Sequence, residues 1–146
     1  MSLTKLIWFG LFCLLLSTPT LNAQTTKPNP ANFDTFIAQV YTGSGADFIN
    51  PDTRRYSYMK ELFEERISYV KSDTEKLDQD NSLALLSEVE LYNDYNRGIS
   101  RDARFDPERF NPFKYKFDFY AADKLVYRVD GTEYLIIIYP QERKKY

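Results

Sequence analysis

A hairpin signal near the carboxyl end constrains the fold of this chain more than any other feature. Asp130 and Gly131 separate two largely apolar runs, 125–129 and 132–139, and Asp-Gly is a preferred centre for a two-residue type I′ turn. The turn predicts two cross-strand contacts, an aromatic pair and an ion pair: Tyr127 with Tyr134, and Arg128 with Glu133. Pairs of this kind stabilise neighbouring strands. The sequence therefore predicts an antiparallel hairpin in this register.

The segment before the hairpin alternates between aromatic and polar residues. Its aromatic positions are Phe113, Tyr115, Phe117 and Phe119. A period of two predicts a strand with one aromatic face, and we expect that face to pack in the core. Within the hairpin, residues 135–138 are apolar on both faces, which predicts a central strand or one that is covered on both sides.

A helix is predicted to start at residue 33, because apolar residues recur there with helical spacing. The residues on this stripe are Phe33, Phe36, Ile37, Val40 and Tyr41. Asn32 is suited to cap the start of the helix and Gly43 to end it.

A second helix is predicted over residues 51–65. Asn50 is a good N-cap, and proline, as in Pro51, is favoured at the first helical position. Residues 66–71 then alternate in a way that favours a short strand. Residues 83–95 fit a helix and a strand equally, and 96–112 has the composition of a long irregular loop.

These elements predict an α+β fold, in which two amino-terminal helices pack on a carboxyl-terminal antiparallel sheet. We expect residues 33–140 to form one domain. The polar, proline-bearing residues 24–32 are predicted to be a flexible linker, and residues 141–146 a polar tail.

Residues 1–23 have the three parts of a secretory signal peptide. Lys5 supplies a positive charge, an apolar run extends over 6–16, and Ala23 suits the position before a cleavage site. A run of about 11 residues is shorter than the roughly 20 that cross a bilayer as a helix. We therefore expect an exported protein, periplasmic or secreted and of bacterial type, with no transmembrane anchor in its mature form.

Composition excludes several classes of chemistry. The chain has no histidine, and its one cysteine, Cys13, lies within the predicted signal peptide. Ser-His-Asp and Cys-His nucleophiles are therefore excluded, as are zinc sites built on imidazole or thiolate. A net charge of −2 argues against a nucleic-acid partner. No phosphate-binding glycine pattern is present, and we expect no cofactor.

The candidate binding surface lies in and just after the irregular loop. Its residues are Arg97, Arg101, Arg104, Arg109 and Tyr120. Guanidinium groups pair well with carboxylate and phosphate, and tyrosine combines an apolar ring with a hydrogen-bonding tip. The alternative is that these arginines form internal salt bridges with the acidic residues near them in the sequence.

Two places in the sequence resemble part of an oxygen-ligated calcium site, one around Asp94 and one around Asp78. Each begins an alternation of oxygen-bearing side chains. A helix–loop–helix calcium site needs glycine at its sixth position and glutamate at its twelfth. Counted from Asp94, these positions hold Ile99 and Phe105, so the pattern does not predict a site.

Two functions fit the sequence. We prefer a non-enzymatic envelope or secreted module that binds a protein, peptide or glycan, because catalytic residue types are missing while the chain holds 12 tyrosines. The alternative is a small hydrolase that uses a pair of carboxylates. Its candidate acids are Glu88, Glu90, Asp94, Asp102 and Asp106.

Overall fold

The computed structural model describes residues 24–73 and 82–142. The predicted signal peptide and residues 143–146 of the predicted tail lie outside the described residues. The helices are α1 (Phe33–Val40), α2 (Ser44–Phe48) and α3 (Arg54–Glu61), which continues as a π-helical turn, Leu62–Arg66. The strands are β1 (Thr25–Thr26), β2 (Ile67–Lys71), β3 (Ala84–Leu85), β4 (Leu125–Arg128) and β5 (Tyr134–Ile138). Short 3-10 turns cover Pro30–Asn32, Leu86–Glu88 and Pro112–Lys114.

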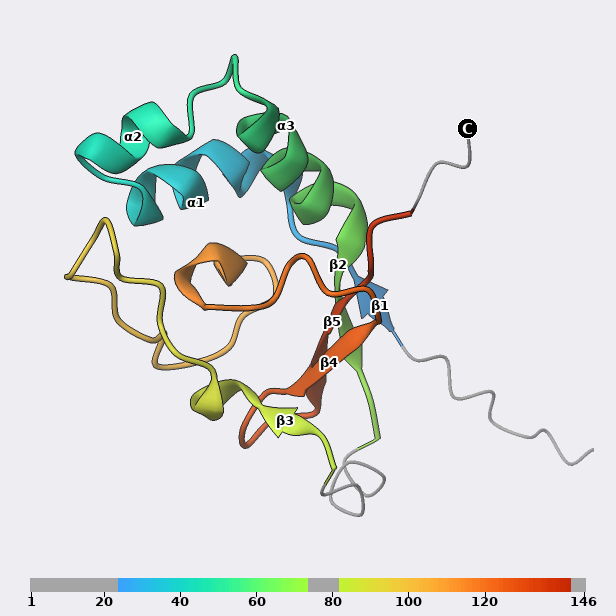
Figure 1. Cartoon of the computed structure of the whole chain (residues 1–146). Helices are drawn as coiled ribbons and strands as arrows, with labels where there is room; N and C mark the ends of the chain where they lie inside the picture. The colour runs from blue at the N-terminus through green and yellow to red at the C-terminus, as the bar shows by residue number, and fades with distance from the viewer. Residues whose placement is uncertain (1–23, 74–81, 143–146) are drawn as a thin grey trace, which may run out of the picture.

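The strands form one sheet in the order β1-β2-β5-β4-β3. All neighbouring pairs are antiparallel except β3 and β4, which are parallel. Figure 1 shows the three helices grouped together, with the segment around Pro112–Lys114 between them and the sheet. The α+β prediction is therefore confirmed, with a mixed sheet in place of a purely antiparallel one. The apolar strand β5 lies between β2 and β4, in the central position that its sequence predicts.

The hairpin of β4 and β5 is present, but its predicted register is wrong. Arg128 pairs with Leu135, and Tyr127 pairs with Ile136, so each partner lies two residues beyond the predicted one. A shift of two residues preserves the faces. For this reason Ile136 still faces the core, where it is fully buried.

The turn itself is wider than a two-residue type I′ turn. Among the described residues only glycines have positive φ; in this turn that is Gly131, at +66°, whereas type I′ needs positive φ at Asp130 as well. The Val129 carbonyl accepts hydrogen bonds from the Thr132 N–H at 3.2 Å and the Thr132 hydroxyl at 3.0 Å. Glu133 therefore lies in the loop, where it forms an ion pair with Lys71 of β2 at 2.8 Å instead of facing Arg128.

The predicted strand over 113–119 is also wrong. Asn111 accepts a hydrogen bond from the Phe113 N–H at 3.0 Å and starts a 3-10 turn there, and the only sheet-like pairing in this described segment is an isolated bridge between Tyr115 and Leu91. The alternation in burial is nevertheless present. Phe113, Tyr115 and Phe117 are buried, which confirms that the aromatic stripe belongs to the core.

The amino-terminal elements largely follow the predicted pattern. Helix α1 buries the four residues of its apolar stripe, Phe33, Phe36, Ile37 and Val40. The second predicted helix starts later than expected, because Asn50 caps a turn: its side chain accepts the Asp52 N–H at 3.2 Å. Thr53 is the actual N-cap of α3 and accepts the Tyr56 N–H at 3.2 Å. The strand predicted after this helix is β2.

Residues 24–32 differ from the flexible linker that the sequence predicts. Thr25 and Thr26 form β1 and pair with Val70 and Tyr69 of β2. Pro28 is buried, and the Lys27 ammonium donates to the Glu65 carbonyl. These contacts close one edge of the sheet.

Residues 83–95, whose sequence fits a helix and a strand equally, contain one short strand and one short helical turn. Ala84–Leu85 is β3, and Leu86–Glu88 is a 3-10 turn. The chain then runs to Asn111 without a helix or a strand beyond the bridge at Leu91, as the composition of 96–112 predicts.

Candidate functional site

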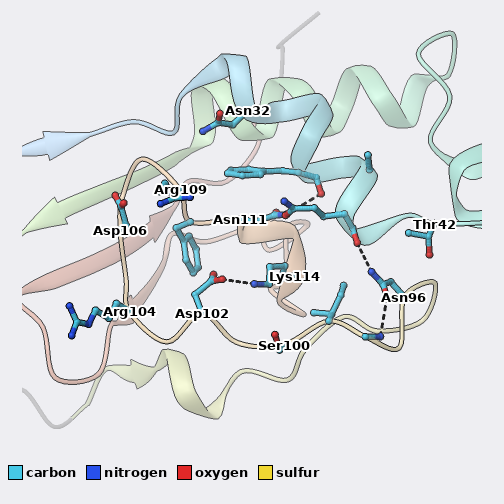
Figure 2. A pocket seen from close by; sticks show the side chains of 16 residues that line it. Asn32, Thr42, Asn96, Ser100, Asp102, Arg104, Asp106, Arg109, Asn111 and Lys114 are labelled. Carbon is cyan, nitrogen blue, oxygen red and sulfur yellow. Dashed lines mark hydrogen bonds and ion pairs between the residues drawn. The ribbon is translucent and has the colours of Figure 1, made fainter.

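A cleft of about 780 Å³ lies between the outer face of α1 and the irregular segment 96–111. Figure 2 shows its lining, in which polar side chains predominate. The polar residues are Asn32, Gln39, Thr42, Asn96, Ser100, Asp102, Arg104, Asp106, Arg109, Asn111 and Lys114. The apolar lining includes Phe36, Ala38, Ile99 and Phe110.

One buried amide fixes the distance between the two walls of the cleft. Asn111 is 1% exposed, and its Nδ2 donates to the Phe36 carbonyl and to Gln39 Oε1, both at 3.0 Å. Its Oδ1 accepts the Phe113 N–H. Since a buried amide without partners is costly, these bonds hold the irregular segment against α1.

A second amide fixes the other end of the cleft. Asn96 Nδ2 donates to the Gln39 carbonyl at 2.7 Å, and its Oδ1 accepts the Gly98 N–H at 2.9 Å. The Thr42 hydroxyl donates to the Tyr95 carbonyl at 2.6 Å. The alternation at Asp94, Asn96 and Gly98 thus serves to fold a loop. No group of three or more possible metal-binding side chains occurs in residues 24–73 and 82–142; Asp78 lies outside those ranges.

The two acids in the cleft each have a structural partner. Asp102 forms an ion pair with Lys114 at 2.7 Å, in which the lysine side chain is 13% exposed and the aspartate 39%. Asp106 accepts the Glu108 N–H at 3.0 Å and so starts the turn that leads to Phe110. The cleft therefore holds its carboxylates in fixed positions.

The four candidate arginines do not converge on one point. Arg104 and Arg109 line the cleft, whereas Arg97 is exposed and lies outside its lining. Arg101 instead holds the Leu86–Glu88 turn, donating to the Leu86 carbonyl at 2.9 Å and to the Val89 carbonyl. In the described part of the chain, the ion pairs are formed by lysines, and none of these four arginines takes part in one. The alternative of internal salt bridges is thus wrong for them.

Tyr120 lies outside the lining of the cleft. It is 74% exposed and stacks in parallel on Tyr58, with 5.0 Å between ring centroids. The Tyr58 hydroxyl donates to the Phe119 carbonyl at 2.7 Å. Behind it Arg66, 6% exposed, donates to the carbonyls of Phe119 and Tyr139. Tyr120 and the arginines therefore belong to different surfaces.

A second cavity, of about 500 Å³, adjoins the cleft and shares Asp102, Arg104 and Phe110 with it. At its edge Asp130 accepts hydrogen bonds from the Ser87 N–H at 2.9 Å and the Ser87 hydroxyl at 2.5 Å. Partial burial alone would raise the pKa of Asp130, but the bonds from Ser87 outweigh it and lower that pKa.

An aromatic cluster borders the Thr42 and Asn96 end of the cleft. Its rings belong to Tyr41, Phe48, Tyr92 and Tyr95, with neighbouring centroids 5.5 to 6.2 Å apart. Arg55 lies over the Phe48 ring at 3.2 Å. Burial, and then the neighbouring Tyr92, raise the pKa of the Tyr41 hydroxyl. A tyrosine hydroxyl is protonated at neutral pH even at its ordinary pKa of about 10, so the shift does not change its charge there.

Sequence reasoning missed the side of the cleft that α1 provides. Ala38 and Gln39 lie on α1 outside its apolar stripe, and Thr42 follows just after the helix ends. Helix positions outside the apolar stripe are normally just solvated. Nothing in this stretch of the sequence distinguishes it from an ordinary solvated face. Comparisons with protein-family models, curated proteins and solved structures gave no match.

Proposed function

We propose that this protein is a non-enzymatic binding module and that its ligand is a glycan held in the cleft between α1 and segment 96–111. The observation that carries the proposal is the concentration of polar groups on both walls, with amides and a hydroxyl on the α1 side and amides, a hydroxyl and guanidinium groups on segment 96–111. Each sugar hydroxyl can donate and accept a hydrogen bond, so a glycan matches a wall of mixed donors and acceptors. The buried rings of Phe36 and Phe110 provide apolar contact at its floor.

Preorganisation supports binding here. The cleft walls are joined by Asn111 and Asn96 through hydrogen bonds of 2.7 to 3.0 Å. A ligand that enters a prearranged cleft loses less free energy to ordering of the protein. The flanking rings of Tyr95 and Phe48 extend the surface with groups that suit the apolar face of a sugar ring.

A peptide or protein ligand has weaker support. Peptides commonly bind by adding a strand to an exposed sheet edge, but the two edge strands, β1 and β3, are two residues long each. Protein interfaces usually centre on a desolvated aromatic or arginine anchor. The cleft instead has polar side chains on both walls beside its apolar residues.

Hydrolysis by carboxylates also has weaker support. A general acid usually needs apolar surroundings that raise its pKa, yet Asp102 is ion-paired with Lys114. Asp106 is exposed and bound to a backbone N–H. Both acids line the cleft, so an assay for released reducing ends, with Asp102→Asn and Asp106→Asn variants, separates binding from cleavage.

Export forms part of the proposal. It rests on the signal-peptide pattern of residues 1–23. Within residues 24–73 and 82–142, no helix is long and apolar enough to cross a membrane. Amino-terminal sequencing of the protein recovered from its own cells tests export; a chain that retains Met1 would contradict it.

The glycan proposal is tested by titrating the chain from Gln24 onward with a panel of neutral and acidic oligosaccharides, followed by NMR shifts of backbone amides. Ala38 is exposed and lines the cleft, whereas Thr35 is exposed on the same helix outside the lining. Ala38→Tyr should fill the cleft and weaken binding by about tenfold or more, equivalent to about 1.4 kcal/mol. Thr35→Tyr is the matched control and should leave affinity unchanged.

Two results would contradict the proposal. If no oligosaccharide in the panel shifts the amides of segment 96–111, the cleft does not bind glycans. If one binds equally well to the Ala38→Tyr variant, it binds elsewhere on the surface.

A further inference from the structure

We infer that the glycan is acidic and that Arg104 and Arg109 recognise its negative charge. This inference rests on the proposed function. It is carried by a difference between the charged groups of the cleft: the acids are engaged by the protein, and these two arginines are not.

The charged side chains of the lining leave one positive charge in excess, because Asp106 is the one acid that remains against the two arginines. The lining holds three basic residues, Arg104, Arg109 and Lys114, against Asp102 and Asp106. Lys114 and Asp102 neutralise each other at 2.7 Å. In residues 24–73 and 82–142, no ion pair or side-chain hydrogen bond engages Arg104 or Arg109. Their guanidinium groups are therefore available to a ligand.

The position of the two arginines suits a ligand that lies along the cleft. Figure 2 shows Arg104, Asp106 and Arg109 toward one end, with Asn96 and Thr42 toward the other. Arg104 extends outward at the rim, and it also lines the adjoining second cavity. A chain of several sugars could thus place hydroxyls near the amides and an acidic group near the arginines.

Chemistry favours a carboxylate on the ligand. Guanidinium binds a carboxylate through two parallel N–H···O bonds, which gives geometric selectivity as well as charge. The whole chain carries a net charge of −2, so it offers no long-range attraction to an anion. Recognition must come from contacts within the cleft, and it should weaken as salt is added.

The test compares two tetrasaccharides that differ only in the carboxylate at C6, a galacturonic acid tetramer and a galactose tetramer. Binding is measured by calorimetry at low ionic strength and again at about 0.15 M. The variants are Arg104→Gln and Arg109→Gln, and Arg97→Gln is the matched control because Arg97 is exposed, unpaired within the described residues and outside both cavities. Tetraglutamate serves as a probe of charge without sugar.

We expect the uronate tetramer to bind more tightly than the neutral one. Arg104→Gln and Arg109→Gln should each lower its affinity by about two- to fivefold, the range for an exposed ion pair. Neither variant should change the affinity of the neutral tetramer, and Arg97→Gln should change neither affinity.

The opposing results are distinct. Equal affinities for the two tetramers, or equal losses in all three variants, would overturn the inference while glycan binding itself stood. Tetraglutamate binding as tightly as the uronate, with the same losses, would also overturn it, because charge alone would then be recognised. If neither tetramer binds, and no oligosaccharide of the panel binds either, the proposed function is rejected.

Discussion

Asn111 joins segments that are far apart in the sequence. Its amide nitrogen reaches α1 at Phe36 and Gln39, and its amide oxygen starts the turn at Phe113. An aspartate at this position would have almost the same shape as asparagine, but it has no N–H group to donate these bonds. The residue therefore links the packing of the core to the width of the cleft, and both properties should change when it is replaced.

Asn111→Ala is expected to lower the free energy of unfolding by about 1 to 3 kcal/mol, because it leaves buried partners without hydrogen bonds. Urea denaturation measures the change. Asn93→Ala is the control, since Asn93 is exposed and surface changes usually stay within about 0.5 kcal/mol. Equal stability of the two variants would show that Asn111 does not hold the cleft.

Asp130 should make stability depend on pH at the acid end. Its folded pKa lies below its ordinary value, which is about 3.9 in an unfolded chain. The group therefore stabilises the fold above the unfolded pKa, and this contribution disappears as the pH falls through the folded pKa. Ser87→Ala removes the hydroxyl donor and should raise the pKa of Asp130 toward its ordinary value. Carboxyl NMR titration measures this.

The control for that titration is Ser44→Ala, because Ser44 is exposed and lies on α2, far from Asp130 in the sequence. It should leave the pKa of Asp130 unchanged. An unchanged pKa in the Ser87→Ala variant would mean that another group holds it low.

The hydrophobic pattern of the helices and strands predicted burial better than it predicted backbone pairing. The aromatic stripe from Phe113 to Phe117 is buried as its period of two requires. Pro112 and the Asn111 cap nevertheless start a 3-10 turn, and a strand needs a partner that the pattern does not reveal. The alternation indicates which side chains face the core. An extended chain that forms no hydrogen bonds with a neighbouring strand shows the same alternation.

The hairpin shows a related limit. The Asp-Gly pair correctly predicted a reversal, but register depends on which residues of the turn adopt positive φ. Only Gly131 does so in this turn, and the Thr132 hydroxyl stabilises the wider loop through the Val129 carbonyl. This side-chain contact forms only in the folded turn, and the turn propensities of single residues do not predict it.

Gly131→Ala isolates the cost of backbone conformation in this turn. An added Cβ would meet nothing within 4 Å, whereas φ is +66°. The left-handed region costs a residue with a Cβ about 1 to 2 kcal/mol, so the free energy of unfolding should fall by that amount. Glu133→Ala, which breaks the exposed pair with Lys71, should cost less. A larger loss in Glu133→Ala would mean that the turn conformation is wrong.

The cleft could be predicted from the sequence only in part. Composition predicts the irregular loop over 96–112, and Arg104 and Arg109 indeed line the cleft. Its other wall is the polar face of α1, which in sequence looks like any solvated face. Bringing the two together depends on long-range contacts such as that of Asn96 with Gln39. A single sequence does not encode such contacts locally.

The amino-terminal edge of the sheet provides a final test, because a flexible linker and a strand predict opposite outcomes. Removing residues 24–26 from the chain that starts at Gln24 deletes β1, its pairs with β2 and the bond from the Lys71 N–H to the Gln24 carbonyl. Each lost backbone bond contributes about 0.5 to 1.5 kcal/mol, so the free energy of unfolding should fall by about 1 to 3 kcal/mol.

The same deletion exposes the edge of β2, which is buried along most of its length. Exposed edges recruit strands from other chains. Sedimentation should therefore detect self-association that grows with protein concentration in the deletion variant and not in the parent chain. Urea denaturation gives the stability change in parallel. If both measurements match those of the parent, residues 24–26 contribute no edge strand in solution, and the linker predicted from their composition is correct.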